Sequence, residues 1–286
     1  MKLLSLLNDP RRDRVLLVIV ALICLLSVPT CQGCLVNGVA FHPEPGMARS
    51  PDDFAAPIQP LTLKTSDNVE ISAFWLPRDS SPCSLIFFHG NAGNASHRFG
   101  AAVDLWNLGI SVLLVDYRGY GLSEGRPSER GIYRDAVAAR DYLVRNFQID
   151  ERRIVLYGRS LGSAAAVDLA GQGEFAGVVL ATPLASGQEM ARAMGFGPLA
   201  MLIGKPFDSV RKIKKLRSPL LVFHGTQDEV IPFEQGKKIY LEAPGEKELV
   251  TLVGADHNTF TQTHGAQFLG AFGKFLRKVC PVERDR

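Results

Sequence analysis

Residues 154–170 read IVLYGRSLGSAAAVDLA and place Ser160 between two glycines, in the pattern G-x-S-x-G. The residues before this pattern are apolar and β-branched, as in a buried strand, and those after it are rich in alanine, as in a helix. A sharp strand-to-helix turn holds a serine in strained backbone geometry. The helix N-terminus and the amide of the next residue, Leu161, can then stabilise an oxyanion. The context predicts that Ser160 is a nucleophile, and a simple helix cap is the alternative.

A serine hydroxyl is a weak nucleophile that needs a base to take its proton and a carboxylate to orient that base. In a strand–turn–helix elbow of this type, the acid and then the histidine follow the serine along the chain. The segment FHGTQDEVIP supplies Asp228 and the segment VGADHNTF supplies His257, each just past an apolar run. We therefore expect His257 to be the general base and Asp228 to orient it.

Other titratable residues fit these roles less well. Asp256 adjoins His257, so its side chain should point elsewhere, and Asp208 lies in an irregular segment. His224 precedes Asp228, which is the wrong order for the base.

The segment HGNAGN, residues 89–94, follows an apolar run and consists mainly of small residues that allow close approach of the backbone to a ligand. We expect the amide of Asn91 to be the second oxyanion donor, with a plain glycine-rich turn as the alternative. His89 should form hydrogen bonds inside this loop, and Asp116 should hold the turn around Arg118. The sequence has no metal-ligand spacing and no dinucleotide-binding glycine pattern, so neither a metal nor another cofactor is expected.

Short apolar runs alternate with helical patterns from residue 84 onward, after a predicted hairpin around residues 67–68. This alternation predicts an α/β fold, with a mostly parallel sheet covered by helices on both faces. Ligands of such sheets bind beyond the carboxyl ends of the strands, where Ser160, Asp228 and His257 are expected. The predicted strands lie in the segments SLIFFHG, ISVLLVDYRG, RIVLYG, FAGVVLATP, PLLVFHGT and ELVTLVG.

The composition is that of an ordinary globular protein: 286 residues, 46% hydrophobic and 21% charged. A net charge of +3 without a basic patch among aromatics argues against a nucleic-acid partner. The basic run at residues 211–217 is interpreted as a solvated helix face, with anionic lipid headgroups as the alternative.

Residues 15–28 form an uncharged apolar run that follows three arginines. We predict an N-terminal membrane anchor over residues 1–40, a linker over 41–60 and one catalytic domain over 61–280, on the non-cytoplasmic side of the membrane. A cleaved signal peptide, with secretion or lipidation at Cys31 or Cys34, is the alternative. Only Cys83 and Cys280 of the five cysteines fall in the predicted domain, and nothing there demands a disulfide-built fold.

The motifs FFHGNAGN, DYRGYGLSEG, YGRSLGSAAA, FHGTQDEVIP and GADHNTF, in this order, resemble those of the alpha/beta-hydrolase superfamily. The resemblance covers residues 61–279 and is strongest to the serine-aminopeptidase-like branch of alpha/beta-hydrolase-domain proteins. That branch includes membrane-anchored members and protein depalmitoylases. The resemblance implies the triad Ser160, Asp228 and His257.

We therefore expect a serine hydrolase that cleaves an ester or thioester through an acyl-enzyme, without a cofactor. Residues 184–204 lie between two strands, where a lid is expected, and Met190, Met194 and Phe196 in this segment are the predicted contacts for a small-molecule or lipid-like acyl substrate. These residues could instead only cover the sheet. An aminopeptidase and a non-catalytic binding protein with the same fold are the alternative functions.

Overall fold

The computed structural model describes residues 37–38 and 40–281, which form an eight-stranded sheet with the order β1-β2-β4-β3-β5-β6-β7-β8. Strands β3 to β8 pair in parallel, whereas β2 pairs antiparallel with both β1 and β4. The predicted hairpin and the mostly parallel sheet are thus confirmed. The strands are β1 (Gln59–Lys64), β2 (Glu70–Leu76), β3 (Ser84–Phe88), β4 (Ser111–Val115), β5 (Ile154–Arg159), β6 (Gly177–Ala181), β7 (Leu220–Gly225) and β8 (Lys247–Leu252).

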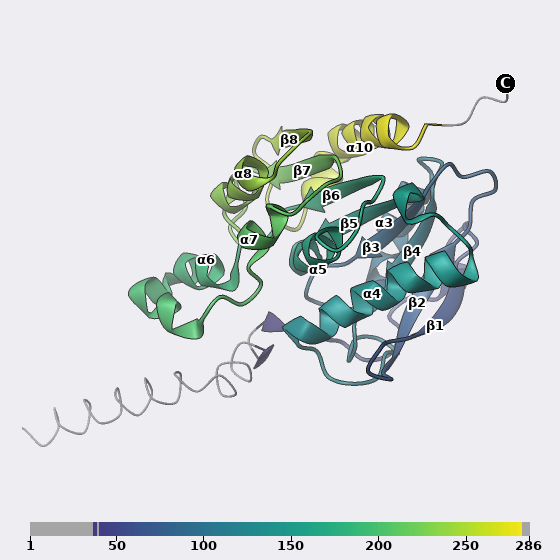
Figure 1. The fold of residues 1–286 in the computed structure, drawn as a ribbon, viewed down its shortest axis with the longest axis horizontal. Coiled ribbons are helices and arrows are strands. Elements are labelled where there is room, and N and C mark those ends of the chain that lie inside the picture. The colour runs from purple at the N-terminus through teal and green to yellow at the C-terminus, as the bar shows by residue number, and fades with distance from the viewer. Residues whose placement is uncertain (1–36, 39, 282–286) are drawn as a thin grey trace, which may run out of the picture.

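Helices cover both faces of the sheet, as predicted (Figure 1). Successive strand residues point to opposite faces, so Ile86 and Phe88 join one apolar core while Leu85 and Phe87 join the other. Helices α4 (Glu129–Asn146), α5 (Leu161–Ala170), α7 (Ser209–Ile213) and α8 (Phe233–Glu242) contribute to the first core. Helices α3 (Phe99–Trp106), α9 (Phe260–Thr263) and α10 (Gly265–Val279) contribute to the second.

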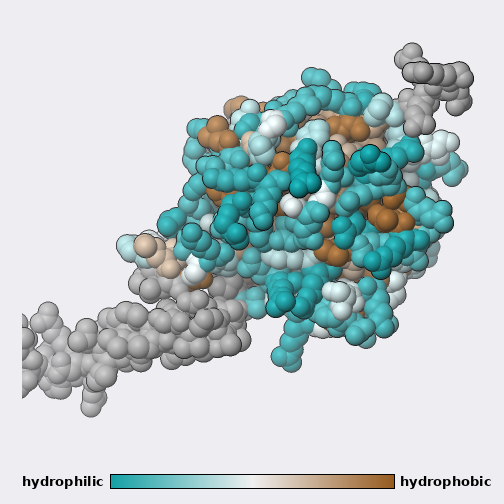
Figure 2. Space-filling view, viewed as in Figure 1, coloured by the Kyte–Doolittle hydropathy of each residue, from teal (hydrophilic) through white to brown (hydrophobic). Residues whose placement is uncertain are grey.

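Helix α4 shows how the sequence pattern sets the packing. Ser128 caps its first turn by accepting a hydrogen bond from the amide of Gly131. Ile132 and Leu143 are fully buried against the sheet and Val137 is half-buried, and Asp135 is the one fully buried charged residue of this helix. The face of the molecule in Figure 2 is mainly hydrophilic, with scattered apolar residues.

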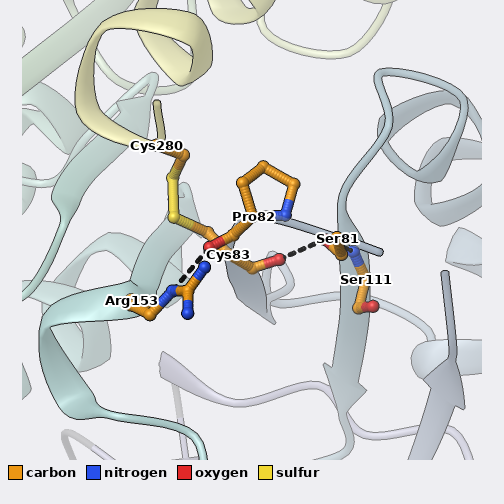
Figure 3. The surroundings of a disulfide bond; sticks show 6 residues. All are labelled: Ser81, Pro82, Cys83, Ser111, Arg153 and Cys280. Atoms are coloured by element: carbon orange, nitrogen blue, oxygen red, sulfur yellow. Dashed lines mark hydrogen bonds between the residues drawn. A yellow bond between two sulfur atoms is a disulfide. The ribbon is translucent and has the colours of Figure 1, made fainter. Parts of the chain in front are cut away.

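A disulfide between Cys83 and Cys280 joins the residue before β3 to the end of α10 (Figure 3). The two cysteines are 197 residues apart in the chain, and both are buried. The Ser81 hydroxyl donates to the Cys83 carbonyl, and the Arg153 guanidinium donates to the Pro82 carbonyl at 2.9 Å, which fixes the chain on the β3 side of the bond. Sequence reasoning did not pair these cysteines.

The segment between β6 and α7 is a small excursion made of α6 (Gly187–Ala191), a π-helical turn η4 (Arg192–Phe196) and a 3₁₀ turn η5 (Gly197–Ile203). Met190 packs against the first core. Met194 and Phe196 instead leave 55% and 54% of their surface exposed, beside a 67% exposed Met201. The segment therefore combines a fixed base with an apolar, solvent-facing tip, in the place where a lid was expected.

The predicted membrane anchor lies almost entirely outside the described residues. Across residues 37–38 and 40–281, none of the helices combines the length and apolarity that a membrane span requires. Residues 41–48, within the predicted linker, pack on the domain: Phe41 is buried and its ring lies 5.9 Å from that of Phe207.

Candidate active site

Ser160 stands at the sharp turn between β5 and α5, with φ 52° and ψ −118°. This is a strained conformation for a residue with a side chain, and it is the geometry of a nucleophile elbow. A Cβ at position 158 would collide with the backbone of α5, and one at position 162 would overlap the Phe88 carbonyl at the end of β3. The two glycines of the motif therefore let strand and helix approach closely enough to form the turn.

The structure brings the three predicted catalytic side chains together. The Ser160 hydroxyl lies 3.1 Å from Nε2 of His257, and Nδ1 of His257 lies 2.8 Å from Oδ2 of Asp228. With Nδ1–H donating to the carboxylate, Nε2 is left to accept the proton of the serine hydroxyl. His257 and Asp228 are both buried, which strengthens this hydrogen-bonded chain by excluding water.

The Asp228 carboxylate is held by four groups. Oδ1 accepts from the amides of Val230 and Ile231, at 3.0 and 2.7 Å, which leaves Oδ2 facing His257. Burial alone would raise the pKa of Asp228, but the hydrogen bonds from His224 and His257 outweigh burial and hold this pKa well below its ordinary value. Asp228 is therefore an ionised orienting group at neutral pH.

His224 is a neighbour of the site that sequence reasoning considered only as a base. Its Nε2 donates to the Ile231 carbonyl at 2.8 Å and lies 3.4 Å from Oδ2 of Asp228. Its Nδ1 is buried without a hydrogen-bond partner among the described residues, and a Cβ at Gly236 would collide with it. His224 thus lies beside the same carboxylate oxygen of Asp228 that faces His257.

Arg159, the variable residue before Ser160 in the motif, holds the loop that carries the base. Its guanidinium donates to the His257 carbonyl at 3.1 Å and to the Asn258 carbonyl at 3.4 Å, and it lies over the Phe260 ring at 5.0 Å. The elbow and the His257 loop are therefore joined directly. No pattern in the sequence pointed to this contact, because residues 159 and 257 are far apart in the chain.

Both predicted oxyanion donors lie at the carboxyl ends of adjacent central strands. Leu161 is the first residue of α5, where a helix leaves the amide without an intrahelical partner. Asn91 follows β3, which pairs directly with β5. The preceding residue, Gly90, is close to Ser160: a Cβ added to Gly90 would lie 3.5 Å from the Cβ of Ser160. Both residues thus lie at the edge of the sheet that carries Ser160.

The loop at residues 89–97 is fixed by buried polar groups. Nδ1 of His89 donates to the Gly90 carbonyl at 2.7 Å and Nε2 lies 3.2 Å from Oδ1 of Asp116, which also accepts from the Ala95 amide at 2.7 Å. His89 thus bonds within the loop, as expected. Asp116 has a structural role, as expected, but its side chain holds this loop, whereas the Arg118 side chain is bound by Asp135 and Asp67.

The competing carboxylates have local structural roles. Asp256 accepts from the Asn258 and Thr259 amides at 2.7 Å each and so shapes the turn after His257. Asp208 caps α7 through the Arg211 amide at 3.2 Å. Across residues 37–38 and 40–281, no group of three or more His, Cys, Asp or Glu side chains could hold a metal ion.

Known proteins resemble this chain in sequence. Residues 81–211 match the family model described as serine aminopeptidase, S33. The alpha/beta hydrolase domain-containing protein aho-3 of Caenorhabditis elegans is 32% identical over 287 residues, covering 91% of this chain and 85% of that protein. An uncharacterized protein of Mycobacterium tuberculosis is 34% identical, covering 84% and 86% respectively. The alpha/beta hydrolase domain-containing protein 17C of Mus musculus is 36% identical, covering 71% and 62%.

Solved structures share the fold. An esterase of Pyrococcus furiosus superposes with a TM-score of 0.70 at 22% identity, covering 83% of this chain and 97% of that one. An alpha/beta hydrolase of Vibrio vulnificus superposes with a TM-score of 0.61 at 26% identity, covering 74% and 80%. With these relatives and this architecture, the chain belongs to the alpha/beta-hydrolase superfamily and is a hydrolase by family.

Proposed function

We propose that this protein is a serine hydrolase that cleaves carboxylic ester or thioester bonds through an acyl-enzyme. The observation that carries the proposal is the hydrogen-bonded chain from Ser160 through His257 to Asp228, with Ser160 on a strained elbow. A helix cap would need neither the positive φ nor the buried histidine–aspartate pair, so the geometry favours the nucleophile over the cap.

The proposed reaction has two stages. The Ser160 oxygen attacks the carbonyl carbon of the substrate while Nε2 of His257 takes the hydroxyl proton, and the amides of Leu161 and Asn91 stabilise the oxyanion. Protonation of the leaving group by His257 releases the alcohol or thiol and leaves an ester on Ser160. Water, activated by the same Nε2, then hydrolyses that ester and regenerates the serine. Asp228 keeps the imidazole in one tautomer throughout.

An aminopeptidase needs a carboxylate to bind the ammonium of its substrate. The two acidic residues near the lid segment are occupied: Glu189 is paired with Lys238 at 2.8 Å and with Arg192 at 3.1 Å, and Asp208 is paired with Arg211 at 3.2 Å. The exposed apolar side chains of Met194 and Phe196 suit an acyl chain better than an ammonium. We therefore propose an apolar acyl substrate.

The test is hydrolysis of p-nitrophenyl esters from two to twelve carbons, with an alanine anilide for comparison. We expect kcat/KM to rise with acyl length, by up to about 0.8 kcal/mol of transition-state binding per added buried methylene. Ser160→Ala should abolish both turnover and fluorophosphonate labelling, while Ser80→Ala, at an exposed loop serine, should retain both. Turnover by Ser160→Ala within tenfold of wild type would exclude the acyl-enzyme, and faster cleavage of the anilide than of any ester would favour the aminopeptidase.

We also propose that an anchor in residues 1–40 places the domain on the non-cytoplasmic side of a membrane. The disulfide between Cys83 and Cys280 supports this proposal, because such bonds persist mainly in oxidising compartments. Fractionation of cells that express the full chain, with alkylation of free thiols before lysis, tests both parts. Recovery in the soluble fraction without cleavage would contradict the anchor, and alkylation of Cys83 and Cys280 in native cells would contradict the compartment.

A further inference from the structure

Residues 41–48, which we call the strap, run across the loop at residues 89–97, which we call the oxyanion loop. At the start of the strap, Phe41 is buried and packs edge-to-face on Phe207. The strap then forms isolated parallel bridges, Pro43 with Gly93 and Pro45 with Gly121. This stretch of chain precedes the hairpin and the whole sheet, yet it lies against the catalytic end of the domain.

Backbone hydrogen bonds fasten the strap at its middle. The Glu44 amide donates to the Gly93 carbonyl at 3.3 Å, and the Glu44 carbonyl accepts from the Gly121 amide at 3.0 Å. The Gly46 amide in turn donates to the Gly121 carbonyl at 2.8 Å. The strap is therefore bonded both to the oxyanion loop and to the turn that follows β4.

The Asn94 side chain adds a second set of bonds. Its amide nitrogen donates to the carbonyls of Glu44 and Gly46, at 3.1 and 2.9 Å, and Asn94 is almost completely buried. The hydroxyl of Ser96, which donates to the Asn94 side-chain oxygen at 2.6 Å, also accepts from the Ala48 amide at 2.8 Å. Strap backbone thus satisfies buried polar groups of the loop that would otherwise cost free energy.

The contact closest to the chemistry is at Asn91, whose amide is the proposed second oxyanion donor. The Asn91 side-chain oxygen accepts from the His42 amide at 2.9 Å and from the Tyr120 hydroxyl at 2.8 Å. Tyr120 is fully buried and cannot move far. Two donors therefore orient the Asn91 side chain, one from the domain and one, the His42 amide, from the strap.

The opposite side of the oxyanion loop is bonded to the domain itself. Asp116 Oδ1 lies 3.2 Å from Nε2 of His89 and accepts from the Ala95 amide, and the Tyr117 hydroxyl donates to the His89 carbonyl at 2.7 Å. These groups come from the ends of β3 and β4. The loop is therefore held between a rigid, sheet-derived side and the strap, and the strap is the part that lies outside the sheet.

We propose that the strap is a positioning element of the oxyanion hole, and that the His42 amide acts through the Asn91 side chain to orient the Asn91 amide. The catalytic part of this inference rests on the proposed serine hydrolase, since an oxyanion forms only in that reaction. Losing this donor should weaken stabilisation of the tetrahedral intermediate more than it weakens binding of the substrate. Small displacements of groups that act on the transition state lower rates by large factors.

The test compares His42→Pro with His42→Ala in the full chain. Proline removes the amide that bonds Asn91, whereas alanine keeps the amide and removes only an exposed imidazole. We expect His42→Pro to lower kcat on p-nitrophenyl butyrate about tenfold or more, with KM changed less than twofold and an unchanged melting temperature. Inhibition by a trifluoromethyl ketone, which forms a tetrahedral oxyanion on serine, should weaken by a similar factor. His42→Ala should match wild type in all four measurements.

Amide hydrogen exchange of residues 91–97 gives a reading that does not require turnover. Faster exchange in His42→Pro than in His42→Ala supports the proposal that the strap holds the oxyanion loop. Equal exchange together with equal kcat in the two variants overturns that proposal. If His42→Pro does not fold, the same measurements are made on Ala48→Pro and Ala48→Gly. Proline removes the Ala48 amide that donates to the Ser96 hydroxyl, whereas glycine keeps it. Absence of Ser160-dependent turnover in wild type would refute the hydrolase instead, while the exchange rates would still report whether the strap holds the loop.

Discussion

The disulfide between Cys83 and Cys280 should contribute several kcal/mol to the free energy of unfolding. It closes a loop of 197 residues, and the chain-entropy relation for such a loop gives about 5 kcal/mol at 25 °C. Natural disulfides typically realise about 2–5 kcal/mol, because reduced chains are not random coils. At about 2–4 °C per kcal/mol for a domain of this size, the Cys83→Ala/Cys280→Ala variant should melt about 10 °C below wild type.

The measurement is thermal and urea unfolding of wild type and the double variant, each with and without a phosphine reductant. Reductant should lower the stability of wild type and leave the variant unchanged. Turnover at 20 °C should be nearly the same in both, because Cys83 precedes β3 whereas Ser160 lies at the opposite, carboxyl end of the neighbouring strand β5. Equal melting temperatures, or a loss of kcat without a loss of stability, would refute this reasoning.

Substitutions at three further residues test the site and the stability of the domain. Asp228→Asn should lower kcat by about four orders of magnitude with the fold intact, because it favours the wrong tautomer of His257; a loss below tenfold would exclude Asp228 as the orienting group. Arg159→Ala should lower kcat more than it raises KM, because the His257 loop loses its hydrogen bond to the elbow. Arg159→Lys should restore part of the rate. Equal kcat in wild type and both variants would contradict a role for this hydrogen bond. Hydrogen bonds from Arg118 hold the pKa of Asp67 below its ordinary value. The ionised Asp67 carboxylate therefore stabilises the folded state above about pH 4, and this stabilisation is lost as the pH falls further. Asp67→Asn should accordingly have a lower urea midpoint than wild type at pH 7. Between pH 7 and pH 3 the midpoint of the variant should fall less than that of wild type, and equal falls in the two proteins would contradict this role of Asp67.

The fold could be predicted from the sequence because each buried strand is a nearly continuous apolar run. Segments such as residues 84–88 and 111–115 have no polar residue beyond the first, so only a doubly covered sheet can bury them. The approach of Ser160, His257 and Asp228 was also predicted, since parallel strands bring their carboxyl ends to one edge. Their chemical roles remain predictions.

The contacts that were missed depend on pairings between distant segments. Arg159 and His257 meet only because β5 and the chain after β8 end at the same edge, and a lone arginine carries no pattern that announces such a partner. The segment at residues 41–48 reads as a linker because it is rich in proline and has no periodicity. It docks instead through backbone amides and carbonyls, which every residue type except proline can supply in full. Asp116 was expected to hold the turn around Arg118, although its side chain contacts His89 and the Ala95 amide instead.

The strand order β4-β3-β5-β6-β7-β8 divides the proposed catalytic groups between the middle and the margin of the sheet. Ser160 follows the central strand β5, whereas His257 follows β8, which pairs with β7 alone and is only partly buried. Marginal strands open in local fluctuations that leave the middle of a sheet intact. Trp75 and Trp106, the two tryptophans of the chain, lie in β2 and α3, far along the sheet from β8. During denaturation, enzyme activity should therefore disappear before tryptophan fluorescence changes. The range of temperature and denaturant over which the protein is active is then set by the stability of the edge strand β8.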